Sequence, residues 1–163
     1  MADLFLFTKT YEVLKRYAED VAELYKRNLI QSDHLATEGL LNSVHTEVVR
    51  DGARIAVDMN LAEYWKYVEY DTKPHFPPPS ALLKWITVRQ IVPYPDAKGR
   101  IPTPKQLAFL IGRKISRVGT KGSHDLTNAV QEINAQYERE IDNAITEDLG
   151  SSADAIIRTF ARR

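Results

Sequence analysis

The stretch from Asn60 to Trp85 constrains the fold most strongly, because a short aromatic helix runs there into a stiff, proline-rich loop. Asn60 can cap this helix, and Glu63, three residues later, can complete a capping box. Residues 72–74 should end the helix, since the residue before a proline avoids the α region. Three prolines then favour extended geometry, and the residue after them can cap a second helix: Pro77, Pro78, Pro79 and Ser80. The stretch predicts a rigid elbow without evident chemistry.

The composition indicates one ordinary globular domain. We expect it to span residues 1–163, with a core at about 4–126 and an acidic helical extension at about 126–163. The 22 basic and 22 acidic residues cancel, which is unusual for a dedicated nucleic-acid binder. The sequence has no cysteine, which excludes disulfides, thiolate catalysis and cysteine-based metal sites. No apolar run approaches the roughly 20 residues that cross a bilayer, so we expect no membrane partner and synthesis in the cytoplasm.

Helical periodicity dominates both ends of the chain. Residues 4 to about 30 predict an amphipathic helix, and residues 32–42 a second, short one. A long C-terminal helix begins near Leu126, and we expect residues 150–152 to interrupt it before a last turn or two. Apolar residues at three- and four-residue steps mark the first helix: Phe7, Tyr11, Leu14, Ala18, Val21 and Tyr25.

Between these helices the period changes to two, which predicts a β-hairpin. The residues at 44, 46 and 48 alternate with His45 and Glu47, and those at 55, 57 and 59 alternate with Arg54, Ala56 and Asp58. Asp51-Gly52 lies between the two runs and favours a tight turn. An open outer edge of such a ribbon could accept a strand from a neighbouring subunit.

The second half of the chain carries strong boundary signals. Residues 86–92 are rich in β-branched residues, so helix and strand remain alternatives there, and a loop follows at about 93–103. The segment Thr103-Pro104-Lys105-Gln106 combines a cap, a first-turn proline and a capping-box glutamine, and Gly119 is placed to end the helix. Its inner face is expected to hold Leu107, Leu110, Ile111 and Ile115. The fold class predicted is α+β: predominantly helical, with a small antiparallel hairpin and a long C-terminal helix.

The net charge of zero hides two oppositely charged segments. Residues 97–124 contain seven basic residues and no acidic one, whereas residues 125–155 contain eight acidic residues and one basic one. Two interpretations of these segments are open. In the first, the segments pack on each other or are solvated faces; in the second, the basic face of one subunit meets the acidic face of the next. The second arrangement is a heterologous contact, which closes rings when the rotation permits.

The sequence shows no catalytic, cofactor or metal site. The four histidines lack metal-ligand spacing, and we interpret His75 as a packed or hydrogen-bonded loop residue rather than a catalyst. The segment 119–123 resembles a phosphate loop but lacks its spacing and follows a helix rather than a strand. Arg113, Lys114 and Arg117 lie on one side of a helix and suit phosphate contacts, so a small nucleic-acid-binding or regulatory protein is the alternative; a hydrolase ranks third.

Two segments resemble a family of tailed-phage proteins. The run from Tyr64 to Pro78, YWKYVEYDTKPHFPP, resembles the Y-x-x-Y-V-E-x-G-T-[RK]-P-H-x-x-P signature of neck and tail-completion proteins, also called minor tail components, of lambdoid-type phages. The run from Ile111 to Lys121, IGRKISRVGTK, is similar to the basic helix and G-T-K turn of that family. Asp71 stands where the family usually has glycine, and the resemblance covers about residues 40–126.

The resemblance implies a virion structural protein at the neck or upper tail, made in the host cytoplasm and assembled as a ring. Its expected partners are copies of itself, connector or adaptor proteins and tail proteins, with possible non-specific contact to DNA in the channel. The resemblance assigns no catalytic residue to this chain. We expect the interfaces to use the proline loop, the basic helix and the acidic helix, with the residues His75, Phe76, Pro77, Pro78, Pro79, Arg113, Lys114, Arg117, Glu138, Glu140 and Asp142.

Overall fold

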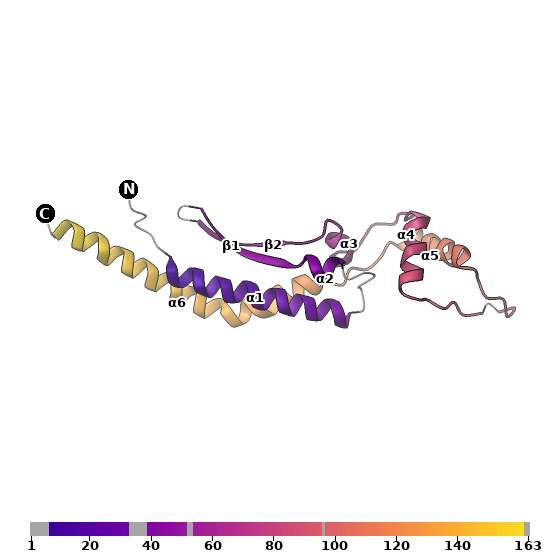
Figure 1. Cartoon of the computed structure of the whole chain (residues 1–163), viewed down its shortest axis with the longest axis horizontal. Helices are drawn as coiled ribbons and strands as arrows, with labels where there is room; N and C mark the ends of the chain where they lie inside the picture. The colour runs from indigo at the N-terminus through magenta and orange to yellow at the C-terminus, as the bar shows by residue number, and fades with distance from the viewer. Residues whose placement is uncertain (1–6, 33–38, 52–53, 96, 162–163) are drawn as a thin grey trace. The chain divides into compact units, whose positions relative to one another are not determined.

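The structure is a computed structural model that describes residues 7–32, 39–51, 54–95 and 97–161. About two thirds of the described residues are helical, and one antiparallel pair of strands completes the fold, which confirms the α+β class (Figure 1). The contacts divide the chain into two compact units. Unit 1 comprises residues 1–28, 43–62 and 125–163, and unit 2 comprises residues 29–42 and 63–124. The prediction of one domain over residues 1–163 stays a prediction.

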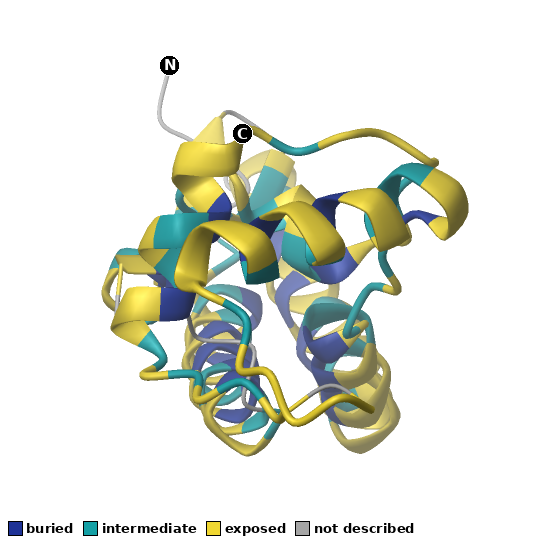
Figure 2. Ribbon diagram, turned by 90° about the vertical axis from the view of Figure 1, so that its right-hand side faces the viewer, coloured by how far each residue is buried: buried dark blue, intermediate teal, exposed yellow. Residues whose placement is uncertain are grey.

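Unit 1 is built on two long antiparallel helices, α1 (Thr8–Gln31) and α6 (Asp125–Ala161). The start of α1 contacts Asp148 of α6, and Asn28, near the other end of α1, donates to the backbone oxygen of Asp125 at 3.1 Å. The predicted periodicity of both helices is confirmed, because each buries one side and exposes the other (Figure 2). The buried side chains are mostly aliphatic and small, and include Val13, Ala18, Val21, Tyr25, Ala129, Ile133 and Ala144.

The prediction that residues 150–152 interrupt the C-terminal helix is wrong, since α6 is continuous to Ala161. Two serine hydroxyls donate to carbonyl oxygens one turn earlier: Ser151 to Glu147 and Ser152 to Asp148, both at 2.9 Å. A single glycine costs a helix only about 1 kcal/mol, so Gly150 does not break it. The last thirteen residues of α6 extend past the first turn of α1 (Figure 1).

The hairpin is confirmed as β1 (His45–Asp51) and β2 (Arg54–Asn60). The register pairs Thr46 with Met59 and Val48 with Val57, so the expected apolar residues share one face. Arg50 connects this hairpin to α1, because its guanidinium donates to the backbone oxygen of Phe7 and lies 4.9 Å from the ring centre of Tyr11. The turn itself lies outside the described residues. α2 (Gly39–Ser43) precedes the hairpin, and most of the predicted helix at 32–42 also lies outside the described residues.

Unit 2 contains α3 (Trp65–Glu69), α4 (Pro79–Val88) and α5 (Pro104–Val118). α4 packs on α5 around Leu82, Ile86 and Ala108. Partly buried residues surround this centre, among them Leu83, Trp85, Ile91, Leu107, Ile111 and Ile115. Three of the four residues predicted for the inner face of α5 are therefore confirmed. Leu110 is the exception, since 43% of it is exposed on the outer side.

Two of the predicted helix caps are wrong. Asn60 does not cap α3, because it is the last residue of β2 and pairs with His45, and the N-cap of α3 is Tyr64 without a side-chain hydrogen bond. Ser80 does not cap α4, because the helix already begins at Pro79. Proline suits the first helical position, where its missing N–H is not needed.

The boundaries of α5 were predicted correctly. Thr103 and Gln106 form the expected capping box, and Gly119 ends the helix with a φ of 72°. In the ambiguous segment 86–92, the helix continues to Val88, a turn follows, and no residue of the segment is in a strand.

Candidate interaction surfaces

The proline loop of unit 2 starts from a contact between two distant segments. Thr72 forms an isolated antiparallel bridge with Thr120. The Thr72 N–H donates to the Thr120 backbone oxygen at 2.9 Å, and the Thr120 N–H donates to the Thr72 hydroxyl at 3.0 Å. The two hydroxyl oxygens are 2.7 Å apart. This bridge connects the two segments that carry the family resemblance.

Two glycines permit this close approach. A Cβ atom on Gly119 would lie 1.9 Å from the backbone oxygen of Thr72, and one on Gly122 would lie 2.2 Å from that of Glu69. The next two N–H groups donate to the backbone oxygens of the last two residues of α3: Ser123 to Val68 at 2.8 Å and His124 to Glu69 at 3.1 Å. The Gly-Thr-Lys-Gly segment at residues 119–122 is thus a turn that packs against the end of α3.

Asp71, which departs from the family pattern, takes part in the same contact. Its carboxylate accepts a hydrogen bond from the Gly122 N–H at 2.8 Å and lies 3.9 Å from His124 Nε2. A glycine at position 71 would lack this acceptor. Sequence reasoning missed the role of Asp71, because its partner is 51 residues away in the chain.

The proline loop leads from this bridge onto α5. His75 Nδ1 donates to the Lys73 backbone oxygen at 2.8 Å, which confirms the expected hydrogen-bonded histidine. The ring of Phe76 lies over Gly112, where an added Cβ would meet it at 2.8 Å, and 6.2 Å from the ring of Phe109. The predicted loop residues and the predicted basic helix therefore form one continuous surface of unit 2. Pro77 is half-buried, and the other residues of the set His75–Pro79 are exposed.

A groove lies beside α5 on the same surface. It has a volume of about 660 Å³ and lies between the loop at 100–102 and the first half of the helix. Its lining mixes apolar and cationic side chains: Arg100, Ile101, Pro102, Lys105, Gln106, Phe109 and Leu110. Phe109 and Leu110 are 57% and 43% exposed, and the basic residues Arg113, Lys114 and Arg117 are exposed further along α5.

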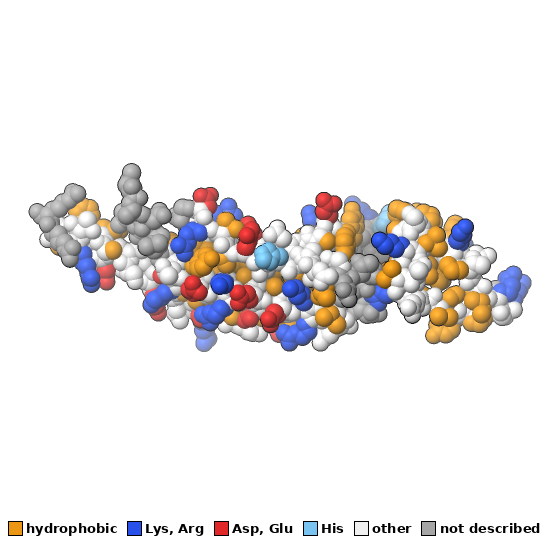
Figure 3. Space-filling view, in the orientation of Figure 1, with side chains coloured by type: hydrophobic (Ala, Val, Ile, Leu, Met, Phe, Trp, Pro, Cys, Tyr) orange, Lys and Arg blue, Asp and Glu red, His pale blue; other side chains and the backbone are white. Residues whose placement is uncertain are grey.

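Exposed apolar side chains are concentrated in unit 2. Of the sixteen large hydrophobic residues that are exposed among the described residues, twelve belong to this unit. Figure 3 shows hydrophobic side chains over α4, α5 and the loop between these helices, with lysine and arginine side chains among them. By sequence, unit 2 has eleven basic and six acidic residues, a net charge of +5, whereas unit 1 has eleven and sixteen, a net charge of −5. Large exposed apolar areas on a protein mark interaction sites.

The predicted acidic residues belong to unit 1. Glu138, Glu140 and Asp142 are all exposed on α6. Glu140 forms an ion pair with Arg16 of α1, so it already has a partner within its own chain. Glu138 and Asp142 lie on the outer side of the helix. The structure thus places the basic and the acidic candidates in different units, and their role as interfaces stays a prediction.

Asp148 is a buried acid that the sequence did not single out. Its carboxylate accepts hydrogen bonds from the Lys9 N–H at 3.2 Å and from the Thr10 N–H and hydroxyl, both at 2.8 Å. Burial raises the pKa of Asp148, but the hydrogen bonds from Thr10 and Lys9 and the Lys9 charge together outweigh it and hold the pKa below its ordinary value. Asp148 therefore caps the N-terminus of α1 from a neighbouring helix.

A second polar contact sets the register of the same two helices. The Tyr137 hydroxyl donates to Asp20 at 2.6 Å, and this hydrogen bond, together with burial and the Asp20 charge, raises the pKa of Tyr137 to about 12. The ring of Tyr137 packs edge-on against Tyr17, whose hydroxyl donates to Asn134 at 2.8 Å. Burial raises the pKa of Tyr17. These groups are structural, since each hydroxyl is occupied by a partner within unit 1.

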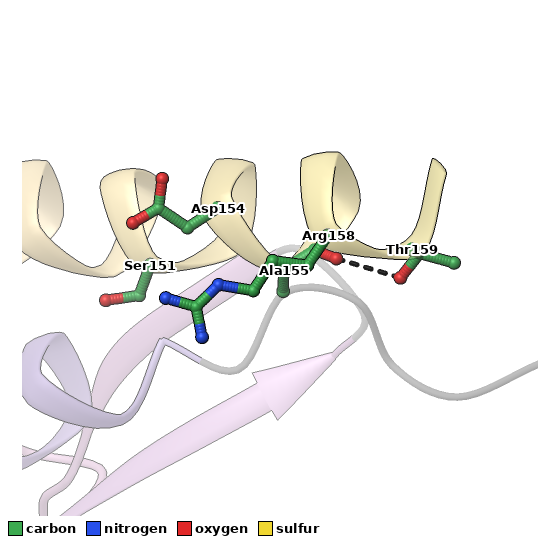
Figure 4. Close-up of a pocket in the computed structure, with 5 residues that line it drawn as sticks. All are labelled: Ser151, Asp154, Ala155, Arg158 and Thr159. Carbon is green, nitrogen blue, oxygen red and sulfur yellow. Dashed lines mark hydrogen bonds between the residues drawn. The ribbon is translucent and has the colours of Figure 1, made fainter. Parts of the chain in front are cut away.

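A polar pocket of about 610 Å³ lies at the end of α6. Its lining residues follow one side of the helix, as Figure 4 shows: Ser151, Asp154, Ala155, Arg158 and Thr159. The Thr159 hydroxyl donates to the backbone oxygen of Ala155. The opposite side of the same turns exposes apolar residues, among them Leu149, Ile157 and Phe160.

Within the described ranges, no cluster of three or more histidine or acidic residues could hold a metal ion. No helix in the same ranges is long and apolar enough to cross a membrane. Comparison with known proteins found no matching family model, no matching curated protein and no matching solved structure. The resemblance to phage neck and tail-completion proteins therefore rests on the two sequence segments quoted above.

Proposed function

We propose that this chain is a structural virion protein of a tailed bacteriophage, a ring-forming subunit of the neck, tail-completion or tail-terminator type. The observation that carries the proposal is the contact between the two resembling segments through Thr72 and Thr120. Segments that share a family pattern and also pack on each other make a single structural element, rather than two separate coincidences of sequence. The proposed role is structural and not catalytic.

The surface of unit 2 supports an assembly role. It combines the proline loop, the groove beside α5 and most of the exposed large hydrophobic residues. A loop that is already held in shape loses little conformational entropy when it binds. The proposed partners are further copies of the chain, connector or adaptor proteins and tail proteins, in the virion.

Averaged electron-microscope images of purified virions and of the purified protein test the proposal. We expect a ring density at the neck or upper tail, and rings of the isolated protein at high concentration. Absence of the protein from virions would contradict it.

A nucleic-acid-binding role is the second candidate, because Arg113, Lys114 and Arg117 are all exposed on α5. Phosphate binding through such residues weakens steeply as the salt concentration rises. Tight binding of a short DNA duplex by the monomer, lost when the three residues are changed to glutamine, would favour this role over a ring subunit. A ring subunit with these residues at its lumen would bind DNA weakly and without sequence preference.

A further inference from the structure

The outer face of α5 has an apolar half followed by a basic half. Phe109 and Leu110 are exposed beside the groove, and Arg113 and Arg117 are exposed one and two turns later. Residues three and four positions apart lie on the same side of a helix, so these four side chains form one face. From Lys105 to Arg117 the helix measures about 18 Å.

The outer face of α6 also has a charged part and an apolar part, but the charged part comes first and is acidic. Glu138 and Asp142 come first and are exposed, and an apolar stripe follows on the same side. We call this stripe the distal stripe; its members are Leu149, Ala153, Ile157 and Phe160, at helical spacings of four, four and three. Its three large residues are 46%, 63% and 70% exposed. From Leu149 to Phe160 the helix measures about 16 Å.

The distal stripe lies beyond the part of α6 that contacts α1. Asp148 binds the first turn of α1, and the stripe begins at the next residue. Arg158, a basic residue in this part of α6, lines the polar pocket on the other side of the helix (Figure 4). Among the described residues, the stripe thus presents an apolar surface with an acidic segment on its N-terminal side.

We propose that the outer face of α6 in one copy of the chain binds the outer face of α5 in a second copy, with the two helices antiparallel. In this direction Leu149 lies opposite Leu110 when Asp142 lies opposite Arg117, because both pairs are seven residues apart along their helices. The rest of the distal stripe then meets the groove, and Glu138 lies beside the basic end of α5. A parallel arrangement would place acidic residues on the apolar half and apolar residues on the basic half. The net charges of +5 and −5 on the two units favour the same pairing of unlike surfaces.

This inference rests on the proposed self-assembly and names the surfaces that carry it. The two faces are different parts of the chain, so the contact is heterologous. A heterologous contact repeats from copy to copy and generates a ring when the rotation closes. An apolar helix face that lies in a groove of its partner is an established mode of protein recognition.

Charge reversal tests the pairing, with sedimentation velocity as the measurement. The first variant carries Glu138→Lys and Asp142→Lys, the second carries Arg113→Glu and Arg117→Glu, and the third carries all four changes. We expect each of the first two to raise the dissociation constant for self-association roughly tenfold or more, and the third to restore it. Glu47→Lys with Asp58→Lys, on the exposed face of the hairpin, is the matched control and should have no effect.

Mixing tests the direction of the contact. Ile157→Ser with Phe160→Ser removes the stripe, and Phe109→Ser with Leu110→Ser removes the apolar half of α5. Each variant alone should be monomeric, whereas an equimolar mixture should form a dimer, because each chain keeps the surface that the other lacks. A stripe that pairs with itself would instead let the α5 variant dimerise alone, and would overturn the inference.

The remaining outcomes separate this inference from the proposed function. Rings that survive all of these changes would overturn the inference and leave the ring proposal standing. A chain that is monomeric at every concentration would contradict both. A stripe variant that loses thermal stability without any change in association would show that the chain covers its own stripe, and would also overturn the inference.

Discussion

In unit 1 the two long helices meet mainly through side chains, whereas in unit 2 distant segments meet through their backbones. Asp148 and Tyr137 each bind a specific partner on α1. In unit 2 the decisive contacts are hydrogen bonds between backbone groups, and they require glycine at positions 119 and 122. Substitutions should therefore affect the two units by different physical mechanisms: loss of buried polar partners in unit 1 and backbone collisions in unit 2.

The largest effect is expected from Gly119→Ala. The new Cβ would lie 1.9 Å from the Thr72 oxygen, and the φ of 72° with a ψ of −163° suits glycine alone. We expect a loss of about 3 kcal/mol or more in the free energy of unfolding, measured by urea titration. Gly99→Ala is the control, because Gly99 has a φ of 75° but no atom within 4 Å of a new Cβ. It should cost only about 1 kcal/mol, and equal losses in both variants would contradict the backbone contact.

The second-largest loss in the free energy of unfolding, this time in unit 1, is expected from Asp148→Ala. The change leaves two N–H groups and one hydroxyl at the start of α1 without their acceptor, at a cost of about 2 kcal/mol at neutral pH. The control is Glu132→Ala on the exposed side of α6, which should change the free energy of unfolding by less than about 0.5 kcal/mol. A loss no greater than that of the control would show that the cap does not stabilise the helix pair.

The pH dependence of the same variant sharpens this prediction. The pKa of Asp148 is lower in the folded protein than its ordinary value of 3.8, so its stabilising effect is present above that value and is lost as the pH falls through the folded pKa. The unmodified protein should therefore lose more stability than the alanine variant in acid. Parallel acid-unfolding curves for the two proteins would contradict the assignment.

A smaller effect is expected from Tyr137→Phe, which removes the hydrogen bond to Asp20. We expect a loss of about 1 kcal/mol at neutral pH. The pKa of Tyr137 is raised from 10.0 to about 12, so its contribution is present below pH 10 and is lost as the pH rises through the folded value. In a pH titration followed by tyrosinate absorbance, this variant should lack the component that titrates at the highest pH. Tyr94→Phe, at a residue that is 91% exposed, should leave that component in place.

The smallest effect should have the opposite sign. Gly150 lies inside α6, and a Cβ there would meet no atom within 4 Å. Gly150→Ala should therefore raise the free energy of unfolding by about 0.5–1 kcal/mol, measured by thermal or urea unfolding. A destabilised variant would contradict a continuous helix at this position. The contrast with Gly119 would show that glycine is required in the turn of unit 2 but not in the helix of unit 1.

The parts of the fold that were predicted correctly depend on neighbouring residues. The hairpin follows from alternation on both sides of Asp51, and the start of α5 from the local pattern at Thr103 and Gln106. The wrong caps have two different causes, one distant in the chain and one local. Asn60 pairs with the distant His45 as the last residue of β2. Ser80 lies inside α4, because the helix already begins at its neighbour Pro79.

The candidate surfaces were predicted only in part. The sequence predicted which segments are basic and which are acidic. It did not predict that Glu140 pairs with Arg16 or that Phe76 lies over Gly112. Such contacts join residues far apart in the chain, and neither periodicity nor turn chemistry reports on them. The structural roles of Asp71 and Asp148 were missed for the same reason, since each carboxylate binds a distant backbone segment.

The central claim is that the chain assembles with copies of itself through unlike surfaces. Native mass spectrometry of the unmodified protein over a range of concentrations tests this claim most directly. We predict a closed oligomer of one copy number that grows with concentration at the expense of the monomer. A monomer at every concentration, or an open series of sizes without a preferred closed form, would contradict the ring.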